Sequence, residues 1–241
     1  VEEARPFQEL DDLEGFSRGA WGDFDNDGDD DLMLNGPRLY QNDGLGHFVD
    51  ITESAVFTNL GTGGGVWGDF DNDGCLDYFG QSGQDILLHN SCNESGEGYL
   101  LSDMTSESGL NDVQSDRDCD GNGEPEYSPT EGSAWLDVDN DGWLDLYLAN
   151  YECSSEFDYF QNYDDRLWRN NRDGTFSDWT QTAGVPNANH AGRGASVIDL
   201  DLDGDQDVFI SNYRLDPNFL LINNGDCLLY TSPSPRDAMR S

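Results

Sequence analysis

Residues 23–31 read DFDNDGDDD, and the same pattern returns three more times along the chain. The other copies are DFDNDGCLD at residues 69–77, DVDNDGWLD at 137–145 and DLDLDGDQD at 199–207. Their common form, D-x-D-x-D-G-x-x-D, places aspartate at positions one, three, five and nine and glycine at position six. A motif that recurs with its internal spacing intact indicates a repeat architecture. The four aspartate loops therefore mark four structural units.

Two further blocks recur in the same order in these units. An apolar run ending in asparagine reads LYQNDG at 39–44, LLHN at 87–90, LWRNNRDG at 167–174 and LLINNG at 220–225. An alternating segment then reads FVDIT at 48–52, LSDMT at 101–105 and FSDWT at 176–180. Alternating segments joined by Asn/Asp-Gly turns are typical of hairpins. Each unit is thus predicted to hold four short antiparallel strands, the pattern of a β-propeller blade.

The fold class predicted for residues 1–226 is all-β, a β-propeller of four-stranded antiparallel blades. We assign full blades to about residues 17–57, 58–110 and 130–185, and a partial blade that stops after its third strand to 192–226. A closed ring needs more blades, so we expect a fragment of a larger propeller. Residues 227–241 break the repeat and resemble a translated sequencing-library adapter. We expect a non-native tail there, the alternative being a short native Ser/Pro linker.

The aspartate spacing predicts a Ca²⁺ site in each of the four loops. Ca²⁺ takes six to eight oxygen ligands, and glycine permits the sharp turn that brings several carboxylates to one centre. Positions one, three, five and nine offer carboxylates, and position seven offers a backbone carbonyl, so its side chain can vary. The expected metal-binding positions are Asp23, Asp25, Asp27, Asp29, Asp31, Asp69, Asp71, Asp73, Cys75, Asp77, Asp137, Asp139, Asp141, Trp143, Asp145, Asp199, Asp201, Asp203, Asp205 and Asp207.

Other interpretations of these loops fit less well. An EF-hand needs glutamate at position twelve and flanking helices, whereas position twelve here is Leu34, Gly80, Leu148 or Ile210. Zn²⁺ favours Cys/His clusters, and Mg²⁺ favours water-rich octahedral sites. Hairpin turn chemistry explains one Asp and one Gly per loop. It does not explain four aspartates at fixed positions, which would repel one another without a cation.

With these blocks in view, the sequence resembles the FG-GAP/VCBS repeat family, which includes integrin-α-type propellers and cartilage-acidic-protein-like bacterial relatives. The stretches WGDFDNDG at 21–28 and 67–74 and LWRNNRDGTF at 167–176 carry the resemblance, which covers about residues 7–226. The resemblance implies a propeller, usually of seven blades, with Ca²⁺ in the hairpin between the first two strands of a blade. It also implies an extracellular role in adhesion or ligand binding.

The composition of the chain argues against several classes of partner and activity. The chain has 241 residues and a net charge of −39, and all 11 of its basic residues are arginine. Such a surface repels phosphate, so we expect no nucleic-acid partner. No apolar run approaches the length of a membrane span, so we expect no membrane insertion. No nucleophile–base pattern or phosphate-binding loop accompanies the three histidines, so we predict that the protein is not an enzyme.

Two long inserts interrupt the repeat, at about 111–131 and 150–166. In an up-and-down blade both lie on the face opposite the aspartate loops, where variable loops commonly bind partners. The second insert holds Tyr151, Phe157, Tyr159, Phe160 and Tyr163, which either contact a protein or glycan or pack under their own loop. The first insert holds a degenerate loop, which is either a fifth cation site or a solvated turn; its acidic residues are Asp116, Asp118, Asp120 and Glu124.

Blade topology also places the cysteines. Cys75 and Cys92 fall on the aspartate-loop face of one unit, and Cys119 and Cys153 fall in the two inserts. We therefore predict the disulfides Cys75–Cys92 and Cys119–Cys153, which together with Ca²⁺ favour a secreted or cell-surface protein.

The function predicted from sequence is an extracellular calcium-binding repeat module for adhesion or recognition of a protein or glycan. The alternatives are an accessory propeller of a secreted enzyme, such as a polysaccharide lyase or phospholipase, and a structural spacer.

Overall fold

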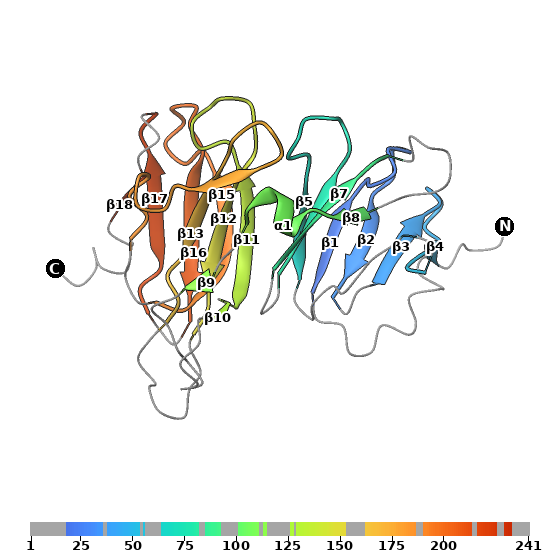
Figure 1. The fold of residues 1–241 in the computed structure, drawn as a ribbon, viewed down its shortest axis with the longest axis horizontal. Helices are drawn as coiled ribbons and strands as arrows, with labels where there is room; N and C mark the ends of the chain where they lie inside the picture. The colour runs from blue at the N-terminus through green and yellow to red at the C-terminus, as the bar shows by residue number, and fades with distance from the viewer. Residues whose placement is uncertain are drawn as a thin grey trace.

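A computed structural model describes residues 18–35, 38–53, 55, 64–81, 85–92, 101–110, 113–114, 126–127, 129–152, 162–186, 190–213, 216–225 and 229–232. These residues form four four-stranded antiparallel sheets, which follow one another along the chain (Figure 1). Within each sheet the strands pair in sequence order. Within a sheet, each strand is therefore antiparallel to the next one along the chain, in an up-and-down arrangement. The predicted all-β class and four-stranded blades are confirmed.

The first two sheets contain β1 (Gly19–Gly22), β2 (Asp31–Leu34), β3 (Arg38–Asn42) and β4 (Phe48–Asp50), then β5 (Gly65–Gly68), β6 (Asp77–Gly80), β7 (Ile86–Asn90) and β8 (Leu101–Asp103). The last two contain β11 (Thr130–Leu136), β12 (Asp145–Asn150), β13 (Arg166–Asn170) and β14 (Phe176–Asp178), then β15 (Gly192–Ile198), β16 (Asp207–Asn212), β17 (Phe219–Asn223) and β18 (Leu229–Ser232). A single helical turn, α1 (Thr105–Ser108), follows β8.

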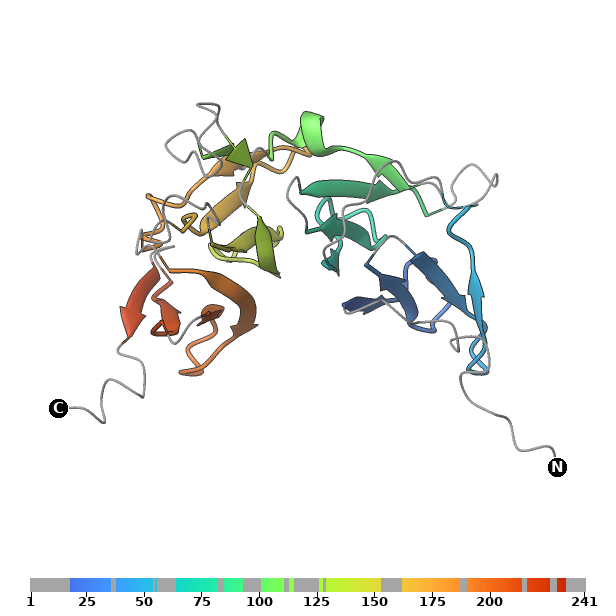
Figure 2. The same ribbon diagram turned by 90° about the horizontal axis from the view of Figure 1, so that it is seen from below.

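The four sheets are arranged in an arc, with the sheet of β1–β4 at one end and the sheet of β15–β18 at the other (Figure 2). The first strands of successive sheets, β1, β5, β11 and β15, contact one another in order. At the closest approach the backbones touch, because a Cβ added to Gly132 in β11 would lie 2.5 Å from the Cα of Gly194 in β15. Only glycine fits at that point.

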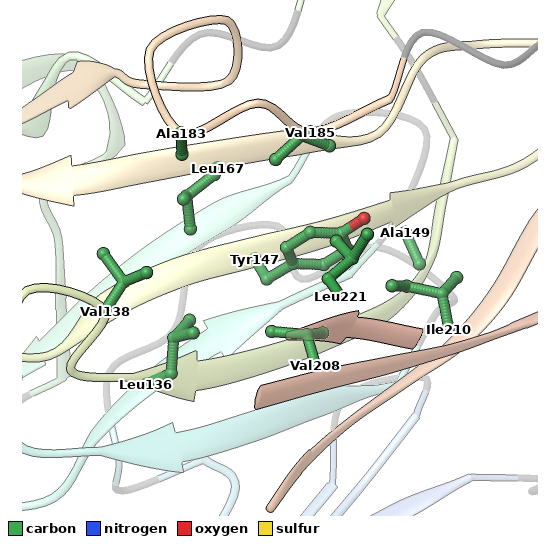
Figure 3. Packing of buried hydrophobic residues seen from close by; sticks show 10 residues of the cluster. All are labelled: Leu136, Val138, Tyr147, Ala149, Leu167, Ala183, Val185, Val208, Ile210 and Leu221. Atoms are coloured by element: carbon green, nitrogen blue, oxygen red, sulfur yellow. The ribbon is translucent and has the colours of Figure 1, made fainter. Parts of the chain in front are cut away.

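Most of the hydrophobic core lies in the three junctions between sheets, with one cluster at each, and a smaller cluster lies on the first sheet alone. Alternate side chains of β12 face opposite neighbours: Leu146 and Leu148 pack toward the second sheet, and Tyr147 and Ala149 toward the fourth. Figure 3 shows the last junction, where Tyr147 lies among apolar residues from both sheets. A strand buried on both faces is a near-continuous apolar run, and the second strands of the first three sheets are buried along their whole length.

Tryptophans that recur two residues before a loop's first aspartate stack on the preceding unit. Trp67 lies against Gly22, and its Nε1 donates to the carbonyl of Ala20 at 3.3 Å. The ring of Trp135 lies against Gly68 as that of Trp67 lies against Gly22. Trp21, which has no preceding sheet among the described residues, is 55% exposed. Recurrence in the same register indicates packing between units rather than ligand contact, and the contacts of Trp67 and Trp135 confirm it.

The D-x-T segments close each of the first three sheets. The hydroxyls of Thr52, Thr105 and Thr180 accept the backbone N–H of Leu39, Leu87 and Leu167 at 2.9–3.1 Å. In each segment the aspartate two residues earlier accepts the threonine N–H. The outermost strand is thereby tied to the third strand by side chains as well as by the ladder.

The structure corrects the sequence analysis in the fourth unit. We expected that unit to stop after its third strand, but β18 pairs with β17 along residues 229–232 and completes the sheet. The open edge of β17 presents unpaired backbone groups to which the following segment can add. The first insert also holds a short hairpin, in which β9 (Val113–Gln114) pairs with β10 (Glu126–Tyr127).

Candidate metal centres in the aspartate loops

Each aspartate loop folds around its own carboxylates. In the first loop, Asp23 accepts the backbone N–H groups of Asp27 and Gly28, both at 3.0 Å, and Asp27 accepts that of Asp29 at 3.0 Å. The second and third loops repeat all three bonds, and the fourth repeats two of them. The sixth-position glycines have φ between 87° and 101°, a conformation that disfavours other residues. Glycine is therefore required for the turn.

The turn gathers three carboxylates in every loop to within 4.8 Å of one another. These groups are Asp23, Asp25 and Asp27; Asp69, Asp71 and Asp77; Asp137, Asp139 and Asp145; and Asp199, Asp201 and Asp203. His89 forms a further group with Asp71 and Asp73. All of these clusters could hold a metal ion, and the all-oxygen donor sets of the four aspartate groups suit a hard cation.

The ninth-position aspartates are buried beneath the loops, each at most 1% exposed; they are Asp31, Asp77, Asp145 and Asp207. One oxygen of each accepts the N–H of the loop's second residue, as Phe70 donates to Asp77 Oδ2 at 3.1 Å. The other accepts the N–H of the recurring asparagine, as Asn90 donates to Asp77 Oδ1 at 2.8 Å. The ninth aspartate thus joins the loop to the third strand, a role that the spacing alone did not predict.

Burial makes these carboxylates reluctant to ionise. It raises the pKa of Asp31 to about 7, of Asp77 to about 8 and of Asp145 to about 7, and neighbouring loop aspartates add to the effect. Burial likewise raises the pKa of Asp71, with Asp73 contributing. Crowded carboxylates with raised pKa values are stabilised in their ionised form by a cation.

Two buried carboxylate oxygens test whether a cation would fit. Asp139 Oδ1 and Asp199 Oδ1 have no hydrogen-bond partner among the described residues. A buried acceptor left without a partner is unfavourable. A cation in the third loop would satisfy Asp139 Oδ1, and one in the fourth loop would satisfy Asp199 Oδ1. The residues present therefore fit Ca²⁺.

The seventh-position side chains differ from one another in their contacts. Cys75 forms a disulfide with Cys92, their Cα atoms 5.7 Å apart, which confirms the first predicted bridge. Asp205 Oδ1 accepts from Asn140 Nδ2 at 2.5 Å. Such varied roles are consistent with the prediction that position seven contributes its backbone carbonyl.

Sequence reasoning missed the residue directly before the recurring asparagine, which contacts the third-position aspartate in three loops. Gln41 Nε2 donates to Asp25 at 2.5 Å and His89 Nε2 lies 3.1 Å from Asp71. In the third loop this residue is Arg169, and in the fourth it is Ile222. The signal available in the sequence was that this residue differs in all four units, whereas the asparagine after it is constant.

The loops are also joined from one unit to the next. Asn90 Nδ2 donates to the carbonyl of Phe24 in the preceding loop at 2.7 Å, and Asn170 repeats this bond to Phe70 at 2.7 Å. In the opposite direction, Asn26 Nδ2 donates to the carbonyl of Gly74 at 2.9 Å. Consecutive loops therefore form one connected row along this end of the sheets.

The opposite end of the sheets carries a different cluster. The guanidinium of Arg193 lies 4.8 Å from the ring centre of Tyr151 and 4.5 Å from that of Tyr213, and donates to the Tyr151 hydroxyl at 3.2 Å. At the same end of the sheets, Arg18, which directly precedes β1, forms an ion pair with Glu131 in β11. Tyr163 is buried at 2% exposure, so it packs within the protein, whereas Tyr151 is only half-buried.

Several predictions fall outside the described residues. They concern the degenerate loop of Asp116, Asp118, Asp120 and Glu124, the pair Cys119–Cys153, and the insert aromatics Phe157, Tyr159 and Phe160. Within the described part of the chain, no helix has the length and apolar character needed to cross a bilayer.

Comparison with known proteins agrees with the repeat. The FG-GAP-like repeat family matches residues 23–80 and 137–210, which include all four aspartate loops, and the chain belongs to this family. A solved structure described as "Structural basis of specific recognition of non-reducing terminal N-acetylglucosamine by an Agrocybe aegerita lection" matches at 16% identity and a TM-score of 0.44. That match covers 88% of this chain and 50% of the other. A search of curated proteins finds no match.

Proposed function

We propose that this chain is a calcium-dependent propeller module whose ions stabilise the row of aspartate loops. The observation that carries the proposal is the four-fold recurrence of gathered carboxylates over a buried ninth aspartate. Crowding and burial disfavour the ionised form of these carboxylates. The positive charge of bound Ca²⁺ would stabilise that form. FG-GAP-like repeats often bind Ca²⁺, which supports the same assignment.

The chain's own residues prepare each loop for the ion. Backbone N–H groups hold the first and fifth carboxylates, and the ninth carboxylate fixes the loop against the third strand. Because Phe24 and Phe70 in the loops accept bonds from the following units, ordering one loop also orders its junction. The ion's proposed role is therefore structural rather than catalytic.

We further propose a secreted location and recognition of a protein or glycan at the end opposite the loops. FG-GAP-like repeats are typical of extracellular proteins, and the Cys75–Cys92 disulfide suits an oxidising compartment. The supporting feature of the surface is Arg193 between Tyr151 and Tyr213, since tyrosine and arginine are enriched at binding sites. A glycan array probed with the chain and with Tyr213→Ala tests this part: loss of a signal in the variant supports it, and no signal from a folded chain contradicts it for glycans.

The calcium proposal is tested by thermal unfolding of the chain in Ca²⁺, in Mg²⁺ and in chelator. Ligand binding to the native state adds RT ln(1 + [L]/Kd), about 2.7 kcal/mol per site when the ligand is at 100 times Kd. We expect a large rise in melting temperature with Ca²⁺ and a much smaller one with Mg²⁺. Equal melting temperatures of a folded sample in Ca²⁺ and chelator would contradict the proposal.

A further inference from the structure

Two arginines, one from β13 and one from the turn after it, form ion pairs with carboxylates of the third aspartate loop. The Arg169 guanidinium lies 2.5 Å from Asp139 Oδ2 and 3.4 Å from Asp141 Oδ2. Arg172, in the turn after β13, forms a second ion pair with Asp141 at 2.5 Å. Two of the loop's carboxylates therefore already have cationic partners.

The other loops have no arginine at the matching position. Gln41 in the first loop is neutral, and Ile222 in the fourth is apolar. His89 in the second loop lies 3.1 Å from Asp71 and carries charge only when protonated. The third loop therefore has the most positive charge fixed beside its carboxylates.

The carboxylate side of these ion pairs is shielded from solvent, although Arg172 itself is half-exposed. The side chains of Asp139 and Asp141 are only 6% and 10% exposed. Arg169 is held from its other side by Trp179, whose ring centre lies 4.6 Å from the guanidinium carbon. The backbone N–H of Arg172 donates to Asn170 Oδ1 at 2.8 Å, which fixes the turn that carries it.

We propose that Arg169 and Arg172 act as built-in counter-ions, which make the third loop the weakest Ca²⁺ site of the four and the least dependent on the ion for its shape. This inference rests on the proposed calcium function. Calcium affinity follows the net charge of the ligand set and its surroundings, and a fixed cation repels a divalent ion at short range. Asp139 Oδ1, which has no hydrogen-bond partner among the described residues, remains available. The loop therefore binds Ca²⁺ weakly and fills last.

The test is Ca²⁺ titration calorimetry at pH 8 on chelator-stripped protein, with ions per chain counted by native mass spectrometry. The central variant is Arg169→Gln/Arg172→Gln, since glutamine is the residue that the first loop uses at the position of Arg169. We expect the wild type to show one weaker ion. In the double variant we expect that ion to bind at least about tenfold more tightly.

Two control variants make the assignment specific. Gln41→Arg introduces the opposite change in the first loop and should weaken one of the tighter ions by about tenfold or more. Arg38→Gln removes one positive charge from an exposed pair with Asp50, away from the loops, and should leave the isotherm unchanged. If the double variant fails to fold, Arg172→Gln alone changes a half-exposed side chain and should tighten the weak ion by a smaller factor.

The outcomes separate the inference from the proposed function. A wild type that binds Ca²⁺ while its arginine variants give an unchanged isotherm overturns the inference and leaves the calcium function standing. A wild type that binds no Ca²⁺ overturns the calcium function itself.

Discussion

The two ends of the sheets are built on different principles. At the aspartate-loop end the same bonds recur from unit to unit: Asn90 to Phe24 in one junction corresponds to Asn170 to Phe70 in the next. At the opposite end the contacts are individual, such as Arg193 between two tyrosines. The recurring end is suited to holding the units together, and the individual end to carrying features specific to this protein.

The difference also lies in how each end balances its charge. The loops gather carboxylates whose pKa values are raised by burial and by one another. At the other end, ion pairs and cation–π contacts are made within the chain, as between Arg18 and Glu131. Under the proposed calcium function, an external cation would neutralise the loop carboxylates, apart from those that Arg169 and Arg172 already pair in the third loop.

The largest effect that we expect to distinguish the two ends is a dependence of the melting temperature on pH. Asp31, Asp77 and Asp145 bind protons more tightly when folded, since their pKa values rise from 3.8 to about 7 or 8. Their contribution to stability is present below about pH 4 and is lost as pH rises through 7 to 8. In chelator, melting temperature should fall between pH 5 and 8. Excess Ca²⁺, which favours the ionised form, should remove the fall.

The Asp77→Asn variant is the control for the pH experiment, because an amide has no proton to lose. Its melting temperature in chelator should depend less on pH than that of the wild type. A wild-type melting temperature that is flat from pH 5 to 8 in chelator would contradict the account of the loop end.

A smaller effect is expected at the other end, where Gly132→Ala should destabilise the protein whether or not Ca²⁺ is present. The added Cβ would lie 2.5 Å from the Gly194 Cα, where only backbone can move. We expect a loss of about 2 kcal/mol, typical of overpacking. Gly194→Ala, whose Cβ would meet the Ser211 hydroxyl at 3.0 Å, should lose less. Denaturant unfolding measures both, and a larger loss for Gly194→Ala would show that the strand contact is misplaced.

The smallest predicted effect is a difference in stability loss between removing a hydrogen bond that joins two units and removing one within a single unit. Asn170→Ala removes a buried bond to Phe70 in the preceding unit, whereas the Asn42 amide donates within its own unit to Asp30 at 3.0 Å. The buried bond should be worth about 1 kcal/mol more. Equal losses for Asn170→Ala and Asn42→Ala in denaturant unfolding would argue against connected loops.

Local patterns in the sequence predicted much of the fold. Alternation and turn chemistry located the strands, and the register of Trp67 and Trp135 indicated packing between units. Blade topology predicted the Cys75–Cys92 disulfide. These features depend on short spacing or on one repeated unit, so they are visible without knowledge of the junctions.

What could not be predicted depends on contacts between distant segments. Asn170 and Phe70 are 100 residues apart, and no local pattern pairs them. Arg169 occupied a variable position inside a constant block, so its contact with the third loop was not foreseen. β18 was missed because its residues depart from the repeat while still pairing with β17.

The most direct test of the central claim is a count of bound calcium. The chain is stripped with chelator and dialysed against buffered Ca²⁺, and the calcium and protein are then quantified by elemental analysis. The account predicts about four ions per chain at saturation, one for each aspartate loop, with the third loop filling last. A folded protein that retains no calcium above the dialysis buffer would contradict it.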